Sequence, residues 1–537
     1  MDQEKEAIIM SKRELVVIGA GPAGLTAAIE AAKQGVDVLL VDENLKAGGQ
    51  LFKQIHKFFG SSAHRSGVRG IDIGKELIEE SKELGIDVWL NSIVMGVLEG
   101  NEVLIEKTDN NTKKLETVIA DKIIIATGAS EKALHFEGWT MPGVMGAGAA
   151  QTMINVHRVL PGKKVLMIGS GNVGLIVSYQ LIQAGAEIVG IVDAASEIGG
   201  YGVHSSKVER AGVPFYLNHT ILKAEGRDET GVEGAVIAEV DDKWEPIPGT
   251  EKNIEADVIT IAAGLKPLSE LAIMSGCQRT YISELGGWLP LHNENMESTV
   301  SGIYVVGDVT GVEEANTALE EGRLAGVDAA DKLGYFKDNA AKDLKNEIRD
   351  RVKGLRLGPF GEDRLKAKED IIKKFYELEN KTNADSNQKK DGPYAVIECE
   401  QEIPCNPCEP ACKFGAIKIG DPITNLPEFD IEKCTGCGLC LPACPGLAIF
   451  LVDETYSEDK STVAFPYEYQ GLPGKGETVN AVDRKGDFVC KAEVVKVQDN
   501  KAFDRTPIVT IAVPDKYINA ARNIEVAAQK GGGKIER

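Results

Sequence analysis

Apolar and polar positions along the N-terminal part of the chain predict two segments of the same design. Residues 12–45 contain the apolar run LVVIGAG, then LTAAIEAAKQG with apolar residues at helical spacing, then the apolar run VDVLLVDE. Residues 163–193 repeat this order as KKVLMIGSG, LIVSYQLIQAG and AEIVGIVD. Both segments predict a strand, a glycine turn, a helix and a second strand, so Gly19 and Gly169 begin equivalent turns.

The C-terminal part of the chain follows different patterns. Residues 336–392 are charged, have weak helical spacing and end in the polar stretch TNADSNQKKDG, which predicts a helical, charged linker. Residues 454–537 contain short runs rich in valine and aromatic residues between Gly, Pro and Asp, which predict a small β domain. Eight of the ten cysteines fall at positions 399–444. Residues 393–453 are therefore predicted to form a separate module.

Composition narrows the possible partners and compartment. A chain of 537 residues is too long for one core, which predicts several domains. With 82 acidic and 60 basic side chains the net charge is −22, which disfavours nucleic acid and anionic membranes as partners. The first residues lack the pattern of a signal peptide and no apolar run is long enough to span a bilayer, so we expect a cytoplasmic protein without a membrane span. Cytoplasmic thiols stay reduced, which favours metal or redox roles for the cysteines over structural disulfides.

The first glycine turn, GAGPAG, has the spacing of a dinucleotide-binding loop. Gly19 permits the tight turn, Gly21 lets the backbone approach a pyrophosphate, and Gly24 lets the helix pack closely on the strand. Asp42 ends the second strand, where a carboxylate can accept the ribose hydroxyls. A purely structural glycine turn is the weaker alternative. The predicted contacts in this segment, including the GGQ stretch expected to line the ligand, are Gly19, Gly21, Pro22, Ala23, Gly24, Asp42, Glu43, Gly49 and Gln50.

The second glycine turn predicts another nucleotide site, for which more than one ligand stays open. Asp193 should repel a 2'-phosphate, which favours NAD over NADP. Another adenine nucleotide and a role as scaffold alone stay open as alternatives. The stretch GGYGVH at 199–204 is interpreted as loop structure. The predicted contacts are Gly169, Gly171, Asn172, Val173, Gly174 and Asp193.

Two further stretches, IIIATGAS at 123–130 and GIYVVGDV at 302–309, resemble the remaining FAD contacts of two-dinucleotide-binding-domain flavoproteins. The resemblance implies an α/β fold in which an FAD domain (12–135 and 280–335) is interleaved with a Rossmann-like NAD(P)-type domain (136–279). It also implies that Asp308 binds the ribityl and phosphate part of FAD. The contacts implied in these stretches and the next helix are Ala126, Thr127, Gly128, Gly307, Asp308 and Ala315.

The cysteine-rich module contains the C-x2-C-x2-C-x3-C-P run of bacterial ferredoxins, which predicts a ferredoxin-like α+β module. A companion run upstream departs from this pattern by three extra residues after Cys399 and by Lys413 in place of proline. In such paired runs the fourth cysteine of each run binds the other cluster. The predicted ligands are Cys399, Cys405, Cys408 and Cys444 for a first [4Fe-4S] cluster, and Cys434, Cys437, Cys440 and Cys412 for a second.

Cys399 is the least secure of these ligands because of the insertion. Without it, the first cluster would be a three-iron form or absent. Zinc sites usually combine two separated C-x2-C pairs, so the third closely spaced cysteine favours a cubane. We interpret Cys277 and Cys490 as buried, inert thiols.

The stretches GAGPAGLTAAIEAAKQGVDVLLVDENLKAGGQ, IGSGNVGLIVSYQLIQAGAE and GGWLPLHNENMESTVSGIYVVGDVTGVEEANTALEEGRLAG resemble the α subunits of heteromeric amine and imino acid dehydrogenases. That family includes relatives of sarcosine oxidase α, hydrogen cyanide synthase B, opine oxidases and dye-linked proline dehydrogenases. The resemblance covers residues 12 to about 335 and implies a hetero-oligomer. In such a hetero-oligomer, a second FAD-containing subunit oxidises a proline-, sarcosine- or opine-like substrate. The present chain then passes the electrons to a carrier.

Two other functions stay open. One is a self-contained NADH:acceptor oxidoreductase of the ferredoxin type. The other is the small subunit of a glutamate-synthase-like complex, although there the cysteine motif precedes the flavin unit. No acid-base residue with a clear substrate role is identified, so the catalytic residues are not assigned.

Overall fold

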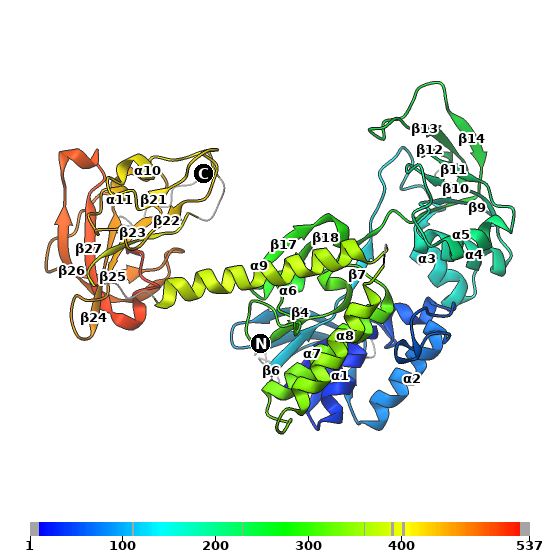
Figure 1. Cartoon of the computed structure of the whole chain (residues 1–537), viewed down its shortest axis with the longest axis horizontal. Helices are drawn as coiled ribbons and strands as arrows, with labels where there is room; N and C mark the ends of the chain where they lie inside the picture. Colours follow the sequence, from blue (N-terminus) through cyan, green and yellow to red (C-terminus); the bar gives the residue numbers. More distant parts are fainter. Residues whose placement is uncertain are drawn as a thin grey trace, which may run out of the picture. The chain divides into compact units, whose positions relative to one another are not determined.

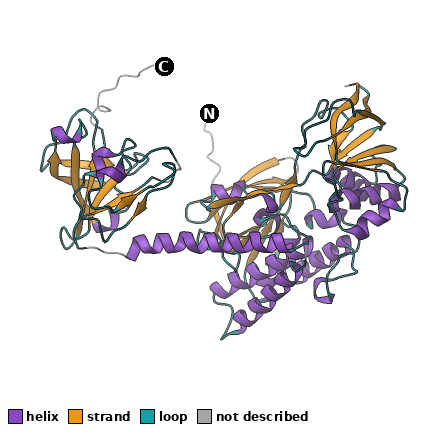
Figure 2. Cartoon of the chain, turned by 45° about the horizontal axis from the view of Figure 1, so that its top comes forward, coloured by secondary structure: helices purple, strands orange, loops and turns teal. Residues whose placement is uncertain are grey.

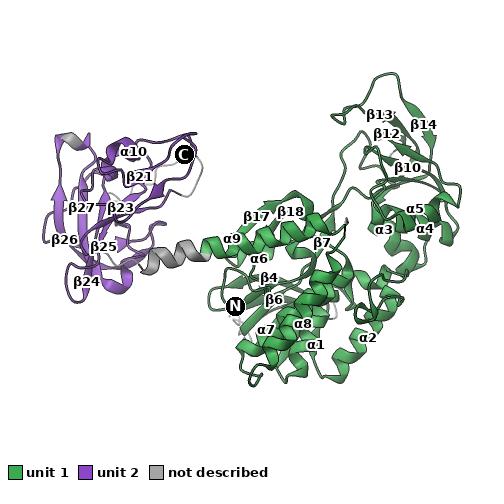
Figure 3. Cartoon of the chain, in the orientation of Figure 1, with its two compact units in different colours: residues 1–380 green, residues 381–537 purple. Residues whose placement is uncertain are grey.

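The computed structural model describes residues 10–109, 112–227, 229–358, 360–387, 391–399 and 403–526, without the side chains of 10, 109, 379–387 and 502. Parts of the predicted N-terminal, linker and β-domain segments, at 1–9, 388–390 and 527–537, lie outside the described residues. The chain forms two compact units, residues 1–380 and 381–537 (Figure 3). No helix in the described ranges is both long and apolar enough to cross a membrane.

The first sheet of unit 1 has the strand order β3-β2-β1-β6-β5-β4, with β19 paired to β6. Its strands are β1 (Met10–Ile18), β2 (Val38–Val41), β3 (Asp87–Trp89), β4 (Ser92–Leu98), β5 (Glu102–Asp109), β6 (Thr112–Ile125) and β19 (Ile303–Val305). Strand β1 pairs in parallel with β2 and β6, and its residues 15–18 are buried, as expected where helices cover a parallel sheet. The helices of this domain are α1 (Pro22–Lys33), α2 (Gly70–Glu83) and α7 (Ala315–Lys332), and its 3-10 turns include η1 (Gly49–Lys53) and η5 (Gly307–Thr310).

A second parallel sheet lies between the two parts of the first in sequence (Figure 1). Its order is β11-β10-β9-β15-β8, formed by β8 (Val144–Gly146), β9 (Lys164–Ile168), β10 (Glu187–Asp193), β11 (Phe215–Leu217) and β15 (Val258–Ile261). An antiparallel sheet of β12 (His219–Arg227), β13 (Gly231–Glu239) and β14 (Lys252–Glu255) accompanies it, with helices α3 (Ala147–Thr152), α4 (Asn172–Ala184) and α5 (Gly202–Glu209). Because β19 returns to the first sheet, the second Rossmann-like unit is inserted into the first, as predicted.

Short elements connect these two sheets. Strand β7 (Ala129–Glu131) pairs with β16 (Leu265–Pro267), and β17 (Arg279–Ile282) pairs with β18 (Gly287–Pro290). Helix α6 (Glu270–Met274) lies between the two pairs in sequence.

The segment 336–392, predicted as a helical, charged linker, is helical as predicted, but its residues up to 380 belong to unit 1 and are not a linker. It forms the helices α8 (Ala340–Leu355) and α9 (Glu362–Asn387). Ile348 and Val352 of α8 pack into the core under α1. Ala367, Ile371 and Phe375 of α9 pack against β17 and β18. These apolar residues recur every fourth position, a spacing that the dense charges of both helices conceal.

Unit 2 contains one seven-stranded sheet of order β20-β23-β24-β27-β26-β25-β28. Figure 2 shows the strands of the chain in orange. Its strands are β20 (Tyr394–Ile397), β23 (Ile449–Asp453), β24 (Lys460–Pro466), β25 (Thr478–Val482), β26 (Phe488–Gln498), β27 (Ile508–Pro514) and β28 (Asn523–Ile524). The short elements α10 (Cys408–Ala411), β21 (Ile417–Lys418), β22 (Glu428–Phe429) and α11 (Cys440–Ala443) lie between β20 and β23 in sequence. Because β23 pairs with both β20 and β24, the predicted module at 393–453 and the predicted β domain share one sheet instead of forming separate domains.

Candidate cofactor sites

Packing explains two of the three glycines in the first turn. A Cβ at Gly19 would lie 2.4 Å from the Ala126 carbonyl oxygen, and one at Gly24 would lie 1.8 Å from the Gly19 carbonyl oxygen. Gly21 instead faces open space at the start of α1, where N–H groups are free to bind an anion. A Cβ at Gly49 would lie 2.8 Å from the Gly21 Cα, so the GGQ stretch lies against the same turn.

Asp42 fastens this turn to the end of β2. Its carboxylate accepts hydrogen bonds from the Ala20 backbone N–H (2.6 Å) and from the backbone and side chain of Asn44 (2.8 and 2.9 Å). The two oxygens of a carboxylate can accept about four hydrogen bonds. The protein already donates three to Asp42, so the predicted ribose contact would use the acceptor position that is left. The side chain of Glu43 is exposed beside it.

The Gly307–Asp308 turn reaches the same region from the other half of the domain. Gly307 has φ +73°, and a Cβ there would lie 2.9 Å from the Ala23 Cβ, so the turn packs directly on α1. Burial raises the pKa of Asp308 to about 7, although the Glu313 backbone N–H donates to its carboxylate (3.4 Å). The other predicted flavin contacts lie around these turns: Pro22 at the start of α1, Gln50 in η1, Thr127 and Gly128 after β6, and Ala315 at the start of α7.

A buried ion network holds the Gly307–Asp308 turn from behind. Glu321 accepts hydrogen bonds from the Gly307 backbone N–H (3.0 Å), from Arg356 Nη2 (2.6 Å) and from Lys368 Nζ (2.9 Å). Arg356 Nη2 also donates to Glu313 (2.6 Å), and Lys368 Nζ donates to the Thr310 hydroxyl (2.7 Å). The four charged side chains are at most 10% exposed. Two carboxylates and two cations therefore balance one another beneath the predicted flavin contact.

Sequence reasoning did not identify this network. Arg356 follows α8 and Lys368 lies in α9, both within the segment interpreted as a helical, charged linker. Their carboxylate partners lie 35 to 47 residues away, so no local spacing reveals the pairing. The nearby His292 is buried, and burial lowers its pKa to about 4.

The second glycine turn repeats the construction of the first. A Cβ at Gly174 would lie 2.1 Å from the Gly169 carbonyl oxygen, whereas Gly171 faces open space. Asp193 accepts hydrogen bonds from the backbone N–H and the hydroxyl of Ser170, at 2.7 Å each. This turn also carries the first two residues of α4, Asn172 and Val173.

The stretch at 199–204 lies against this turn in the way that GGQ lies against the first. A Cβ at Gly200 would lie 3.0 Å from the Asn172 backbone nitrogen, and Asn172 Oδ1 accepts a hydrogen bond from the Tyr201 N–H (2.8 Å). Asn172 Nδ2 donates to Glu314, which precedes α7 of the other Rossmann-like unit (3.2 Å). Residues 199–201 are thus part of the turn's surroundings and 202–204 begin α5, so the interpretation of this stretch as loop structure holds only in part.

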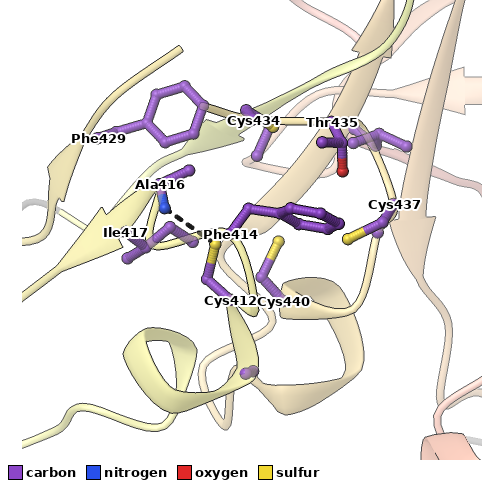
Figure 4. Close-up of a pocket in the computed structure, with 13 residues that line it drawn as sticks. Cys412, Phe414, Ala416, Ile417, Phe429, Cys434, Thr435, Cys437 and Cys440 are labelled. Atoms are coloured by element: carbon purple, nitrogen blue, oxygen red, sulfur yellow. Dashed lines mark hydrogen bonds between the residues drawn. The ribbon is translucent and has the colours of Figure 1, made fainter. Parts of the chain in front are cut away.

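The structure brings the eight clustered cysteines together in the two groups of four that the sequence predicts. Cys399, Cys405, Cys408 and Cys444 line a cavity of about 260 Å³. Cys412, Cys434, Cys437 and Cys440 line a second cavity of about 20 Å³, together with Phe414 (Figure 4). Phe414 is half exposed, and a cluster in the second cavity requires its ring to turn outward.

The two cysteine runs share one local construction. Helix α10 begins at Cys408 and is followed by Cys412, while α11 begins at Cys440 and is followed by Cys444. The backbone N–H of Ala416 donates to Cys412 Sγ (3.2 Å), and that of Ala448 donates to Cys444 Sγ (3.5 Å). Hydrogen bonds to cluster sulfurs are one of the factors that set a cluster's reduction potential.

Electrostatics also reflects the grouping of the thiols. Burial, followed by the neighbouring Cys434, raises the pKa of Cys440 to about 12. Burial and the nearby Cys444 raise the pKa of both Cys405 and Cys408. Metal binding must displace these protons, because the thiolate is the ligand.

Among the described residues, no group of three or more His, Cys, Asp or Glu side chains is arranged to hold one metal ion. A cubane needs another arrangement, because its four irons each take one thiolate and the sulfurs surround a cavity. The two remaining thiols, Cys277 and Cys490, are buried as expected, and Cys277 donates to the Ser298 hydroxyl (3.2 Å).

Similarity to known proteins agrees with this architecture. An opine oxidase subunit from Rhizobium meliloti is 29% identical over 360 residues, which cover 64% of this chain and 68% of that protein. The HcnB subunit of hydrogen cyanide synthase from Pseudomonas protegens is 26% identical over 352 residues, 61% of this chain and 72% of that protein. A solved thioredoxin reductase from T. acidophilum matches with a TM-score of 0.50 and 22% identity, over 60% of this chain and 99% of that one. These relatives confirm the predicted resemblance and the Rossmann-like fold.

Family models match part of each unit. Residues 403–448 match the model described as 4Fe-4S dicluster domain, which begins after Cys399. Residues 13–322, more than half of the chain, match the model described as pyridine nucleotide-disulphide oxidoreductase. The chain is thus an oxidoreductase that belongs to the pyridine nucleotide-disulphide oxidoreductase family and carries a 4Fe-4S dicluster domain after it.

Proposed function

We propose that this chain is the electron-transferring subunit of a heteromeric dehydrogenase that oxidises an amine, amino acid or imino acid. In this proposal unit 1 binds FAD, unit 2 binds two [4Fe-4S] clusters, and electrons pass between them. The substrate is proline-, sarcosine- or opine-like, and a second FAD-containing subunit removes its hydride. An electron carrier is the further partner.

The distribution of the cysteines is the observation that carries this proposal. Many members of the family use a pair of cysteines beside the flavin, but no cysteine precedes Cys277 in this chain. Cys277 itself is buried, and burial raises its pKa, so it is a poor nucleophile. Disulfide exchange in unit 1 therefore has no suitable thiol. The eight grouped cysteines of unit 2 supply the alternative outlet for electrons.

The chemistry of the bound groups suits this division. FAD accepts two electrons together, whereas each [4Fe-4S] cluster carries one electron at a time, so the pair converts two-electron into one-electron transfer. The role of the chain is to hold these groups. The open face at Gly21 and the turn at Gly307 and Asp308 are the proposed FAD contacts, and the two groups of four cysteines are the proposed cluster ligands.

A second candidate function follows from the second glycine turn. Gly171 leaves open space at the start of α4, and the carboxylate of Asp193 disfavours a 2'-phosphate, so this site suits NAD or another adenine nucleotide. If NADH binds there and reduces the flavin, the chain is a self-contained NADH:acceptor oxidoreductase of the ferredoxin type.

Anaerobic purification from the native host distinguishes the two functions. The proposed function predicts a copurifying second flavoprotein, bound flavin, two clusters by iron count, and bleaching of the complex by an amine or imino acid. The second candidate predicts that NADH alone bleaches the isolated chain and that Gly171→Val, which fills the open space, abolishes this reduction. Rapid reduction of the isolated chain by NADH without a partner subunit would overturn the relay.

A further inference from the structure

The three extra residues after Cys399 raise the question of what holds this cysteine at the first cluster site. Cys399 follows β20 and Glu398, whose backbone N–H donates to the Ala448 carbonyl (2.9 Å) beside β23. The backbone of Glu398 is thereby fixed to the sheet. Cys399 lines the larger cavity together with Cys444, although it lies outside the matched dicluster region, 403–448.

The side chain of Glu398 is held by a buried arginine that directly precedes β28. Arg522 Nε donates to Glu398 Oε1, and the Arg522 side chain is 9% exposed. Arg522 Nη1 also donates to the carbonyl oxygens of Ile518 (3.0 Å) and Ala521 (2.8 Å), and its guanidinium lies 5.3 Å from the centre of the Phe450 ring. These three hydrogen bonds, from two of its nitrogens, and the stacking on Phe450 fix the orientation of the guanidinium.

A second arginine approaches the same point from another turn. Arg484 lines the cavity with Cys399, and its Nη2 donates to the Glu398 carbonyl oxygen (3.3 Å). Arg484 is 57% exposed, so its charge is largely screened and its contribution is the smaller one. Both arginines belong to the residues after 453 that carry no recognised ligand motif.

We propose that the C-terminal strands position Cys399 as the fourth ligand of the first cluster, with Arg522 as the positioning residue. The ion pair between Arg522 and Glu398 fixes the residue before Cys399 and so compensates for the longer spacing to Cys405. This inference rests on the cluster content of the proposed function, but not on its substrate or partner. It assigns a role to strands that would otherwise only complete a sheet.

The test compares Arg522→Met with Arg522→Lys, Cys399→Ser and Lys491→Met, the last an exposed cation on β26 of the same sheet. Each full-length protein is purified anaerobically, and its iron content is measured. It is then oxidised mildly with ferricyanide. An incompletely ligated cubane loses one Fe²⁺ and gives one electron to ferricyanide, and a three-iron cluster remains. The paramagnetic three-iron signal is measured by electron paramagnetic resonance.

Arg522→Met is expected to behave like Cys399→Ser, with loss of one iron per chain, a three-iron signal from one cluster and an intact second cluster. Arg522→Lys should restore the fourth iron in part, Lys491→Met should match the wild type, and combining Arg522→Met with Cys399→Ser should add no further loss. Two intact cubanes in folded Arg522→Met would overturn the inference, and so would equal loss from both clusters with unchanged circular dichroism. A wild-type chain without clusters would instead overturn the proposed function.

If Arg522→Met fails to fold, Arg484→Gln tests the same idea, because it removes the hydrogen bond to the Glu398 carbonyl and the long ion pair between Arg484 Nη1 and Glu398 Oε2 (3.9 Å) while Arg522 stays in place. It is expected to give a smaller three-iron signal confined to one cluster. A wild-type response in Arg484→Gln, together with a wild-type response in Arg522→Lys, would then overturn the inference.

Discussion

Lys368 gives the most direct test of the ion network behind the proposed flavin site. Its side chain is 3% exposed and donates to the Thr310 hydroxyl and to Glu321. Lys368→Met keeps the unbranched side chain but removes one of the two cations that neutralise Glu321. Removing one partner of a buried ion pair costs roughly 3 to 5 kcal/mol. Because Arg356 still contacts Glu321, we expect a cost near the lower end, about 3 kcal/mol.

This cost should divide between the folding of unit 1 and the binding of FAD. Since 1.4 kcal/mol corresponds to a factor of ten, about 3 kcal/mol would weaken FAD binding at most about 100-fold if the turn at Gly307 took the whole effect. Any remainder lowers the free energy of unfolding. The assay therefore measures both quantities, the FAD dissociation constant from flavin fluorescence and the stability of the apoprotein from urea unfolding.

Two controls separate the network from the mere loss of a lysine. Lys366→Met removes an exposed cation two residues away on the same helix, and it should leave both quantities unchanged. In Lys368→Met, the buried carboxylate of Glu321 keeps only one of its two cations. Adding Glu321→Gln removes this negative charge and should restore part of the lost flavin affinity and stability. Wild-type flavin affinity and wild-type stability in Lys368→Met would refute the idea that the network holds the turn.

Three further outcomes are expected. Gly24→Ala should destabilise unit 1 by about 1 to 3 kcal/mol in urea unfolding, because its Cβ would lie 1.8 Å from a carbonyl oxygen, and equal stability of Gly24→Ala and the open-site variant Gly21→Ala would contradict this. The raised pKa of Asp308 means that ionisation costs stability as the pH rises toward 7. The stabilising effect of Asp308→Asn on the apoprotein should therefore grow by about 2 kcal/mol between pH 5 and 7 and then level off, whereas a gain independent of pH would argue against a buried carboxyl. Cys440→Ser should abolish the second cluster and about half of the iron while the first cluster stays, and simultaneous loss of both signals would show that the two cavities do not bind clusters independently.

The parts predicted correctly from the sequence are those in which a single residue type meets a local physical requirement. Gly19 and Gly24 are needed because any Cβ would meet backbone, and the spacing of such glycines is visible along a few residues. The same holds for the two groups of cysteines, because the spacing of paired runs places the fourth cysteine of each run in the group of the other run. For Asp42, the sequence predicted the position at the end of β2. Its hydrogen bonds to Ala20 and Asn44 could not be predicted, because they depend on the folded turn.

The parts that were missed depend on contacts between residues far apart in sequence. Helices whose few apolar residues stand among dense charges look solvated. Helical spacing places Lys368, which is buried, on the face of Ile371 and Phe375 and Lys366, which is exposed, away from it, but it does not reveal the distant carboxylate that Lys368 pairs with. The predicted boundary between the cluster module and the β domain was wrong for a related reason. A change of composition at residue 453 suggested a new domain, but β23 hydrogen-bonds to strands on both sides of that change.

The unpredicted residues share one more property, which concerns function. Arg356, Lys368 and Arg522 all lie outside the regions that match the two family models, 13–322 and 403–448. Each of them nevertheless pairs with a carboxylate that directly supports a predicted cofactor contact, Glu321 at the Gly307 turn or Glu398 before Cys399. A cation that is buried costs free energy unless its partner is fixed, so such pairs hold both partners in one arrangement. We therefore expect the segments outside the two matched regions to support both proposed cofactor sites, so that variants in these segments change flavin and cluster retention as well as stability.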